Sequence, residues 1–415
     1  MARHLGLDRS LVTVIAILLL FGLLVLYSAG QTDVPSFAAA GAWRRQLVWL
    51  VGGTVLAWLA FRVSPRLLEW AALPVYTLSL ILLGLTLLVG RGAGTAAGTK
   101  SWIFINGHAI GQPAEFAKLA TVLMLARHLS GRREAAETLS GLLPACMIAG
   151  LPALLVLVQP DLGSALVFVG VLFAMLFWAG TPPSLLFLLA SPVGSLLLAF
   201  NLWTWVGWMV VLGVLLAVWR PFFWEGVTVA VANSVMGFLA LPIWRGLAPY
   251  QQNRLLTFLN PEVDPQKAGY HAIQSKVAIG SGGWLGNGYL EGPQKRLAFL
   301  PEQHTDFIFA VVGEELGFLG VLAALVLFFM LFTVLVRIAR RASDPFSSLT
   351  VFGILGLLFT HVFENVGMTV NVMPITGIPL PFFSYGGSFL LATAIGVGLC
   401  FRAAWDARMS GYLDV

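Results

Sequence analysis

Apolar segments of membrane-spanning length recur along almost the whole chain. Of its 415 residues, 58% are hydrophobic and only 10% are charged. In a bilayer, only helices and closed barrels satisfy every backbone hydrogen bond internally, and a helix needs about 20 mainly apolar residues to cross. The sequence therefore predicts an all-α polytopic membrane protein. We expect about twelve spans, at residues 11–29, 46–61, 68–89, 112–129, 141–158, 164–180, 184–200, 203–219, 225–243, 304–338, 348–369 and 386–402.

The distribution of arginine and lysine predicts the orientation of these spans. One set of helix ends and short loops carries most of the arginines, whereas the other set carries Arg44, Arg45, Arg91 and Lys100. Short cytoplasmic loops are enriched in these residues. We therefore expect both termini to be cytoplasmic and the long polar stretch 244–303 to lie on the outer face of the membrane.

This polar stretch does not have the composition of a disordered loop. Residues 267–279 suit a short amphipathic helix, with apolar side chains on one side. Basic residues outnumber acidic ones in the stretch, and two interpretations stay open: a solvated basic loop, or a surface that binds an anionic substrate. The cations are Arg245, Arg254, Lys267, Lys276, Lys295 and Arg296.

Asp306 stands where the polar stretch turns into a long apolar helix. An ionisable side chain at that depth is costly, so its default interpretation is functional. If the helix includes Asp306, the small residues Ala310, Gly313, Gly317 and Gly320 share its face and allow another helix to approach closely. We therefore expect the carboxylate to point into a cavity lined by protein.

A second group of polar residues opens the fourth span. Pro113 suits the first turn of a helix, and Glu115 and Lys118 are three residues apart, so they can pair on one face. Either this is a structural ion pair, or Lys118 also faces a bound phosphate. Two further sites have mainly structural interpretations: a tight turn at Asp161, and helix–helix hydrogen bonding by His361, Glu364 and Asn365.

Two glycine-rich segments resemble nucleotide-binding loops but lack their context. They span residues 90–94 and 280–288, and neither follows a strand of a βαβ unit. The histidines show no spacing typical of a zinc site. Nothing in the sequence indicates a nucleic-acid interface.

Five sequence blocks, in order over nearly the whole chain, resemble the SEDS family (shape, elongation, division and sporulation). Further segments, Asn365-Val-Gly-Met368 and Gly377-Ile-Pro-Leu-Pro-Phe382, favour the elongation member of that family over its division member. The blocks are Trp102 with Gln112-Pro-Ala-Glu-Phe-Ala-Lys118, Gln159-Pro-Asp-Leu-Gly163, Gly269-Tyr-His-Ala-Ile-Gln-Ser-Lys-Val-Ala-Ile-Gly-Ser-Gly-Gly283, Leu300-Pro-Glu-Gln-His-Thr-Asp-Phe-Ile-Phe-Ala310 and Phe383-Ser-Tyr-Gly-Gly-Ser388.

The resemblance implies a peptidoglycan glycosyltransferase that polymerises lipid II at the outer face of the bacterial cytoplasmic membrane. The family's catalytic aspartate matches Asp306, which could act as a general base. The departing polyprenyl pyrophosphate needs positive charge, from side chains or from a divalent cation such as Mg²⁺ or Mn²⁺. The expected partner is a class B penicillin-binding protein. The substrate-binding residues that we expect are Trp102, Glu115, Lys118, Arg45, His304, Thr305 and Lys276.

The chain departs from the family pattern in two places. The family has ten spans, so residues 203–243 are interpreted as an inserted helix pair. Ala298 stands where many relatives carry an acid, so no auxiliary carboxylate is expected there. Two other functions stay open, a lipid II flippase and a non-catalytic scaffold for the penicillin-binding protein.

Overall fold

The structure is a computed structural model that describes residues 7–34, 39–92, 99–105, 108–132, 136–247, 249–260, 269–300 and 302–413. Nearly all the regular structure in these residues is helical, which confirms the predicted fold class. Within them, the only sheet is the antiparallel hairpin of β1 (Ile103–Ile105) and β2 (His108–Gly111).

Each of the twelve predicted spans coincides with a helix. Eight of the helices are long and apolar enough to cross a membrane; α6 and α7 are shorter apolar helices, and α2 and α4 complete the set. The number of membrane crossings therefore stays a prediction, although the helices are present. They are α1 (Arg9–Ala29), α2 (Ala42–Arg62), α3 (Pro65–Val89), α4 (Pro113–Ser130), α5 (Leu139–Val158), α6 (Leu162–Trp178), α7 (Pro183–Leu198), α8 (Leu202–Trp219), α9 (Phe223–Gly246), α13 (Ile308–Arg341), α14 (Pro345–Thr369) and α15 (Gly387–Leu413).

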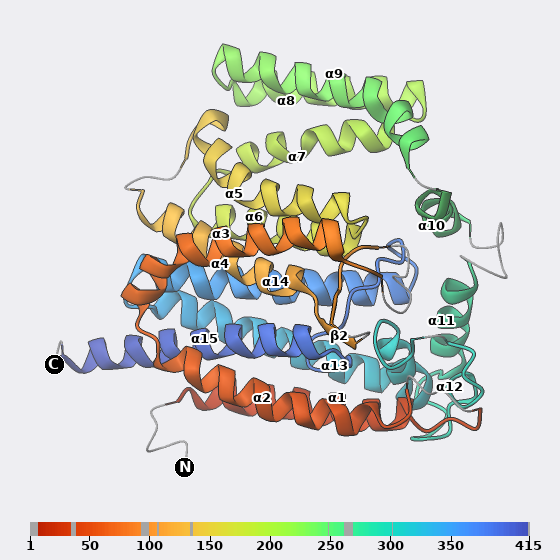
Figure 1. The fold of residues 1–415 in the computed structure, drawn as a ribbon. Coiled ribbons are helices and arrows are strands. Elements are labelled where there is room, and N and C mark those ends of the chain that lie inside the picture. Colours follow the sequence, from red (N-terminus) through yellow and green to blue (C-terminus); the bar gives the residue numbers. More distant parts are fainter. Residues whose placement is uncertain are drawn as a thin grey trace.

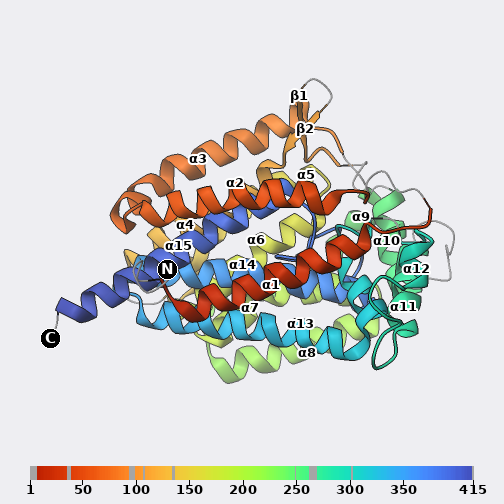
Figure 2. The same ribbon diagram turned by 90° about the horizontal axis from the view of Figure 1, so that it is seen from below.

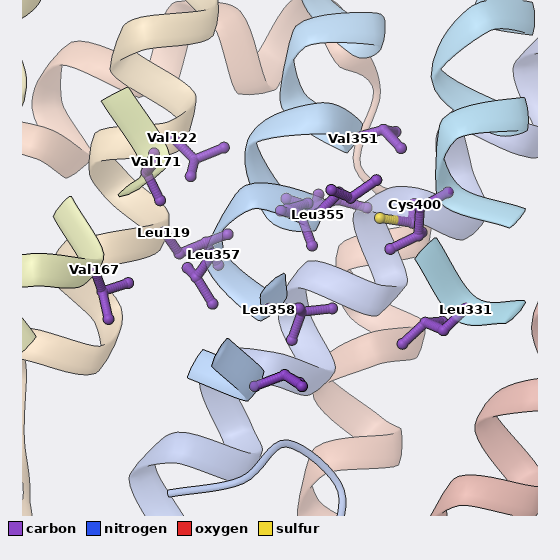
Figure 3. Close-up of a cluster of buried hydrophobic side chains, with 14 of the residues drawn as sticks. Leu119, Val122, Val167, Val171, Leu331, Val351, Leu355, Leu357, Leu358 and Cys400 are labelled. Carbon is purple, nitrogen blue, oxygen red and sulfur yellow. The ribbon is translucent and has the colours of Figure 1, made fainter. Parts of the chain in front are cut away.

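Helix α14 lies at the centre of the bundle. It packs against α4, α6, α13 and α15. Figure 3 shows its apolar side chains meeting residues from all four neighbours, including Leu119, Val171, Leu331 and Cys400. Phe359 and Phe363 leave one side of α14 exposed, whereas its polar residues His361, Glu364 and Asn365 are buried against neighbouring parts of the protein.

Helices α8 and α9 form the outermost layer of the bundle and pack on α7 (Figure 1). The fully buried Asn233 of α9 holds this layer, because its amide donates to Ser191 and accepts from Ser195 and Trp208. Glu225 also accepts a hydrogen bond from the backbone of Leu139. The helix pair is thus docked at the periphery; its status as an insertion stays a prediction.

The two ends of the bundle carry different segments. Arg408 near the end of α15 pairs with Asp8 at the start of α1, at 2.7 Å. Helices α10 (Pro249–Leu259), α11 (Tyr270–Ser281) and α12 (Pro293–Arg296) gather at the opposite end with the hairpin (Figures 1 and 2). Helix α11 confirms the short helix predicted at 267–279, although Lys267 itself lies outside the described residues. This arrangement agrees with the predicted topology, in which the polar stretch and the termini face opposite sides.

Helix α13 differs from the continuous helix predicted at 304–338. It starts at Ile308 and is interrupted at Gly317, where φ is 61° and ψ is −159°, a conformation essentially restricted to glycine. Asp306 therefore lies in the turn before the helix, and the prediction that it shares a helical face with residues 310–320 is wrong. The small residues do allow close approach, but of α11 and the loop after it: Gly313 packs on Ile279.

The loop after α11 is hydrogen-bonded into the break of α13. Phe318 and Leu319 donate backbone hydrogen bonds to the carbonyls of residues 283 and 284, at 2.9 and 3.2 Å. The amides of residues 287 and 288 donate to the carbonyls of Glu314 and Glu315, at 3.0 and 3.1 Å. The loop thus satisfies backbone groups that the break leaves unpaired. This docking explains the glycine-rich segment 280–288, since a Cβ at Gly286 or Gly317 would collide with the facing backbone.

Replacing Gly317 by alanine should destabilise the protein. Alanine would have to adopt a positive φ and would meet the backbone of the docked loop, and strain of this kind costs on the order of 1–3 kcal/mol. Thermal unfolding of the purified protein measures the effect. Gly150→Ala is the matched control, because Gly150 is helical with open space around it; equal melting temperatures for both variants would contradict the role assigned to the break.

Candidate active site

Asp306 lies in a turn, residues 302–307, whose backbone is held from one side by three hydrogen bonds. Its side chain is buried, with 8% of the residue exposed. The amide of Asn365 donates to the carbonyl of Asp306 at 2.8 Å, and the hydroxyl of Ser384 donates to the carbonyl of Thr305 at 2.6 Å. The backbone amide of Tyr385 donates to the carbonyl of His304 at 2.9 Å. The position of Asp306 is therefore set by α14 and by the segment between α14 and α15.

The segment 376–386 is itself tied to the same residues. Asn365 also donates to the carbonyl of Ile378 at 2.7 Å, so one amide joins this segment to the Asp306 turn. Gly377, with a φ of +75°, lies beside the carboxylate: a Cβ built on it would be 3.4 Å from Oδ2 of Asp306. On the far side, Gln46 of α2 donates to the carbonyl of Ser384 at 3.1 Å.

A buried ion pair supports the turn from its other side. The ammonium of Lys295 lies 2.8 Å from Glu315, and both side chains are almost completely buried. Gln303, in the Asp306 turn, donates to the carbonyls of Ala29 and Lys295 at 2.9 and 3.3 Å. Lys295 was expected to be either solvated or facing an anionic substrate, and the structure contradicts both interpretations. Its charge is used within the protein, between α1, α13 and the loop.

The predicted pair of Glu115 and Lys118 is confirmed, at 2.8 Å. The ammonium also lies 3.2 Å from Nε2 of His361, whose Nδ1 is 3.2 Å from the carbonyl of Pro379. Because an ammonium can only donate, we assign Nε2 as the acceptor and the ring proton to Nδ1. The network therefore runs from α4 through α14 to the segment that touches Asp306. In this conformation the Lys118 side chain is fully buried.

The other polar residues predicted near the site behave differently from one another. Asp161 caps α6 and accepts a hydrogen bond from Gln112 at 3.1 Å, which agrees with its structural interpretation. The predicted helix–helix hydrogen bonding is confirmed for His361, which contacts Lys118 of α4. Asn365 instead bonds to the Asp306 turn and to the segment 376–386. The carboxylate of Glu364 is buried beside the hydroxyl of Thr376 in the segment 376–386, and within the described residues it bonds to no other helix.

Of the expected surface residues, Arg45 comes nearest to the turn. Its guanidinium carbon lies 5.2 Å from the centre of the Tyr385 ring, and that ring is 6.0 Å from the His304 ring. Lys276 is exposed on α11, and Trp102 is half-buried with its backbone paired to Arg91. Neither makes a hydrogen bond or ring contact to the turn within the described structure. Thr305 takes part through its carbonyl, and its hydroxyl bonds to Glu302.

Two imidazoles lie close to the Asp306 turn: His304 belongs to the turn and is buried, and His271 is partly buried. Burial, and then the positive charge of Arg45, lowers the pKa of His304 to about 4. His271 stacks on Phe307 at 5.8 Å, and burial, followed by the charge of Arg254, lowers its pKa as well. Both rings are therefore neutral near pH 7, and they can exchange hydrogen bonds with a ligand without adding positive charge.

The described residues offer no closed metal site. Among them, no three histidine, cysteine, aspartate or glutamate side chains gather closely enough to hold an ion. Mg²⁺, however, is commonly bound by one or two carboxylates together with substrate phosphates. Asp306 and Glu302 are the carboxylates of the turn that could take part in such an arrangement.

Comparison with known proteins identifies the family. A sequence model described as Cell cycle protein, which represents FtsW, RodA and SpoVE, matches residues 8–220 and 196–409. This chain belongs to that family. The result confirms the predicted SEDS membership. The two matched stretches overlap over residues 196–220, which contain α8.

Relatives match over nearly their full lengths. The chain is 36% identical to the peptidoglycan glycosyltransferase RodA of Treponema pallidum, over 94% of this chain and 96% of that protein. It is 36% identical to the peptidoglycan glycosyltransferase MrdB of Escherichia coli K12, over 95% and 92%. A probable peptidoglycan glycosyltransferase FtsW of Trichlorobacter lovleyi is 35% identical, over 97% and 94%. These names confirm the predicted enzyme class. Since RodA and FtsW proteins match about equally, the preference for elongation stays a prediction.

Solved structures agree with the fold. A chain from a structure described as the structural coordination of polymerization and crosslinking by a peptidoglycan synthase complex has a TM-score of 0.69 and 31% identity, covering 96% of this chain and 98% of that one. The crystal structure of Thermus thermophilus rod shape determining protein RodA has a TM-score of 0.61 and 29% identity, covering 96% and 97%.

Acidification should destabilise the protein through His304. The unfolded imidazole binds a proton below its ordinary pKa of 6.5, whereas the folded one does so only below about 4. The stability contribution is therefore complete above pH 6.5 and is lost as the pH falls toward 4. At pH 5 the loss should reach about 2 kcal/mol, since one pKa unit corresponds to about 1.4 kcal/mol.

Thermal unfolding of the wild type and of His304→Gln at pH 7.5 and pH 5 measures this effect. The variant should lose less stability between the two pH values than the wild type does. His271 is present in both proteins, so its contribution cancels. Equal losses would contradict the assignment of a neutral, buried His304.

Proposed function

We propose that this protein polymerises lipid II into glycan strands for cell-wall elongation, with Asp306 as the general base. The observation that carries the proposal is a buried carboxylate whose turn is held by hydrogen bonds from two sides of the bundle. The turn also lies at the end of the bundle that carries α11 and α12, since α13 begins there. Named relatives that are peptidoglycan glycosyltransferases support the same chemistry.

In the proposed reaction, a sugar hydroxyl of the acceptor attacks the anomeric carbon of the donor. Asp306 takes the hydroxyl proton as the new carbon–oxygen bond forms. The bond between the anomeric carbon and the pyrophosphate oxygen breaks, and its electron pair leaves with the polyprenyl pyrophosphate. Asp306 immediately precedes the N-terminal end of α13, where the helix dipole favours an ionised carboxylate, the form that a base needs.

The leaving pyrophosphate requires positive charge, and three cations could supply it. Arg45 stands beside Tyr385 and His304, and Lys276 is exposed on α11. Lys118 is buried against Glu115 and His361, so it would have to exchange partners. A divalent cation carried by the pyrophosphate would add charge next to Asp306; EDTA should then stop polymerisation and added Mg²⁺ or Mn²⁺ should restore it.

In the proposed function, the site lies at the outer face of the membrane, and the protein acts together with a transpeptidase of the penicillin-binding class. A similar chain belongs to a peptidoglycan synthase complex in which polymerisation and crosslinking are coordinated. The side of the membrane can be checked with a cysteine at the exposed Lys276 position, which an impermeant reagent should label in intact cells. Labelling only after lysis would overturn the proposed orientation.

Asp306→Asn should abolish polymerisation while leaving the fold intact. The amide is nearly isosteric but cannot accept a proton, and general-base assistance is worth about 10²–10⁴-fold. Glycan formation from lipid II by the purified protein, alone and with a penicillin-binding protein, is the measurement. Asp33→Asn is the control, because it removes an exposed carboxylate at the same end of the bundle.

The outcomes of that assay separate the candidate functions. A near wild-type rate from Asp306→Asn would remove this residue from the mechanism. No glycan from either protein, under conditions in which lipid II crosses the bilayer, would favour a flippase. Activity that appears only from the partner would favour a scaffold.

Lys118 should contact the pyrophosphate in addition to neutralising Glu115. Removing one member of a buried pair costs roughly 3–5 kcal/mol, because the other charge is left unpaired. The double variant Glu115→Gln with Lys118→Met should therefore regain melting temperature relative to either single variant. Its initial rate should stay low, because the leaving group has lost a cation.

The chain provides a matched control in the Lys295–Glu315 pair. Both pairs have an ammonium–carboxylate distance of 2.8 Å and buried side chains. For Glu315→Gln with Lys295→Met, stability and rate should recover together, as expected of a purely structural pair. The same joint recovery at Lys118 would show that it has no role toward phosphate.

A further inference from the structure

The loop docked in the break of α13 presents two large apolar side chains to the outside. Trp284 is 74% exposed and Leu285 is 76% exposed. The backbone of this loop is fixed, since the carbonyl of Trp284 accepts a hydrogen bond from Leu319. The Trp284 ring also lies edge-on to the ring of Phe318, with 5.1 Å between their centres. These two side chains are therefore held outward by a rigid backbone.

The exposed apolar surface of α13 begins at the same level. Every residue from 308 to 315 is buried, whereas Phe318 and Leu319 are 48% and 52% exposed. Beyond the break, residues 318–341 form a helix of about 36 Å at 1.5 Å per residue, longer than the roughly 30 Å hydrocarbon core. The part of α13 after Gly317 is thus sufficient to cross the membrane, and the part before it is covered by protein. The exposed apolar residues continue along the helix at Leu322, Leu325, Val326, Phe329 and Met330.

We infer that Trp284 and Leu285 insert into the lipid interface, and that the break at Gly317 marks the boundary of the bilayer. The two side chains continue the lipid-facing surface of α13. If the loop lay in water, this large apolar patch would be exposed to solvent. Tryptophan and tyrosine favour this region because one end of each side chain is apolar and the other can reach water. Tyr289, also half-exposed, donates to the carbonyl of Leu24 on α1 and extends the aromatic surface to a second helix.

A loop can lie at this depth only if its backbone is satisfied by protein. Four backbone hydrogen bonds join residues 283–288 to α13, and the amide of Gly286 donates to the carbonyl of Gly282, so much of the loop's backbone is satisfied by protein. Gly286 and Gly288 adopt positive φ values of 84° and 106°, which bring the loop close to the helix. The glycine-rich sequence is therefore suited to a short interfacial anchor, with apolar side chains at its tip.

If the proposed function is correct, the anchor formed by Trp284 and Leu285 also fixes the distance of Asp306 from the hydrocarbon core of the membrane. Residues 306 and 317 are separated by at most about 16 Å along a helix axis, so the carboxylate would stand on the outer side of the hydrocarbon boundary. The pyrophosphate of a lipid-linked substrate lies in the polar headgroup layer on that same side. Fixing the loop in the interface would keep the base level with the bond that it helps to break.

Depth-dependent fluorescence tests the insertion without requiring activity. Leu285→Cys, in a background with Cys146→Ser and Cys400→Ala, would carry an environment-sensitive NBD label in phosphatidylcholine–phosphatidylglycerol vesicles. Quenching by lipids with a spin label near the headgroup, together with protection from iodide, is the expected result. Lys276→Cys is the control, because its exposed position on α11 should be quenched by iodide.

Two results would overturn the insertion. Quenching of the Leu285→Cys label by iodide alone would place the loop in water. Protection from both iodide and spin-labelled lipid would mean that protein covers it, either a second copy or a partner. These readings remain interpretable even if the protein forms no glycan, so they are distinct from a failure of the proposed function.

A kinetic experiment tests whether insertion of the loop fixes the position of Asp306 relative to the membrane. Trp284→Ser with Leu285→Ser should raise KM for lipid II about tenfold in vesicles and leave the rate in detergent unchanged, because micelles impose no fixed height. Val277→Ser, a second exposed apolar position at the same end, should change neither. Equal KM values for the double variant and the wild type in vesicles would refute the effect on height.

Discussion

Backbone polar groups buried away from water need partners within the protein, and the arrangement around Asp306 depends on this requirement. The turn 302–307 is not helical, and the carbonyls of His304, Thr305 and Asp306 are paired with donors from elsewhere in the chain. Asn365, Ser384 and the backbone of Tyr385 supply the missing donors. The break of α13 poses the same problem, and the loop 283–288 solves it with backbone hydrogen bonds. An irregular segment that carries the buried Asp306 carboxylate can therefore be stable, because side chains and loops from elsewhere replace the hydrogen bonds of a helix.

Two buried lysine–glutamate pairs flank the Asp306 turn and differ in what they join. Lys118 and Glu115 belong to one helix, and their network continues through His361 to the segment beside Asp306. Lys295 of α12 and Glu315 of α13 join these two helices and support the turn through Gln303. A buried pair contributes little net stability, because desolvation of the charges offsets their attraction. Their role here is positional, because breaking either pair would leave a buried charge without its partner.

The family assignment and the geometry answer different questions. Matches over nearly the full length establish membership and enzyme class. They do not explain why Asp306 is placed as it is; the hydrogen bonds from α14 and the segment 376–386 do. The outer helices α8 and α9 are remote from that explanation, because they pack on α7 and are held through Asn233. These outer helices therefore take no part in the contacts that hold the turn.

The sequence alone predicted what depends on local pattern. Apolar run length gave the twelve helices, spacing of three residues gave the Glu115–Lys118 pair, and motif order gave the family. Tertiary structure decided whatever joins residues far apart in the chain: Lys295 with Glu315, Asn365 with the carbonyl of Asp306, and His361 with Lys118. It also placed the break at Gly317, where apolar periodicity predicts an unbroken helix. That break is stable only because a distant loop binds its free backbone groups, and no pattern within the helix encodes a partner located elsewhere.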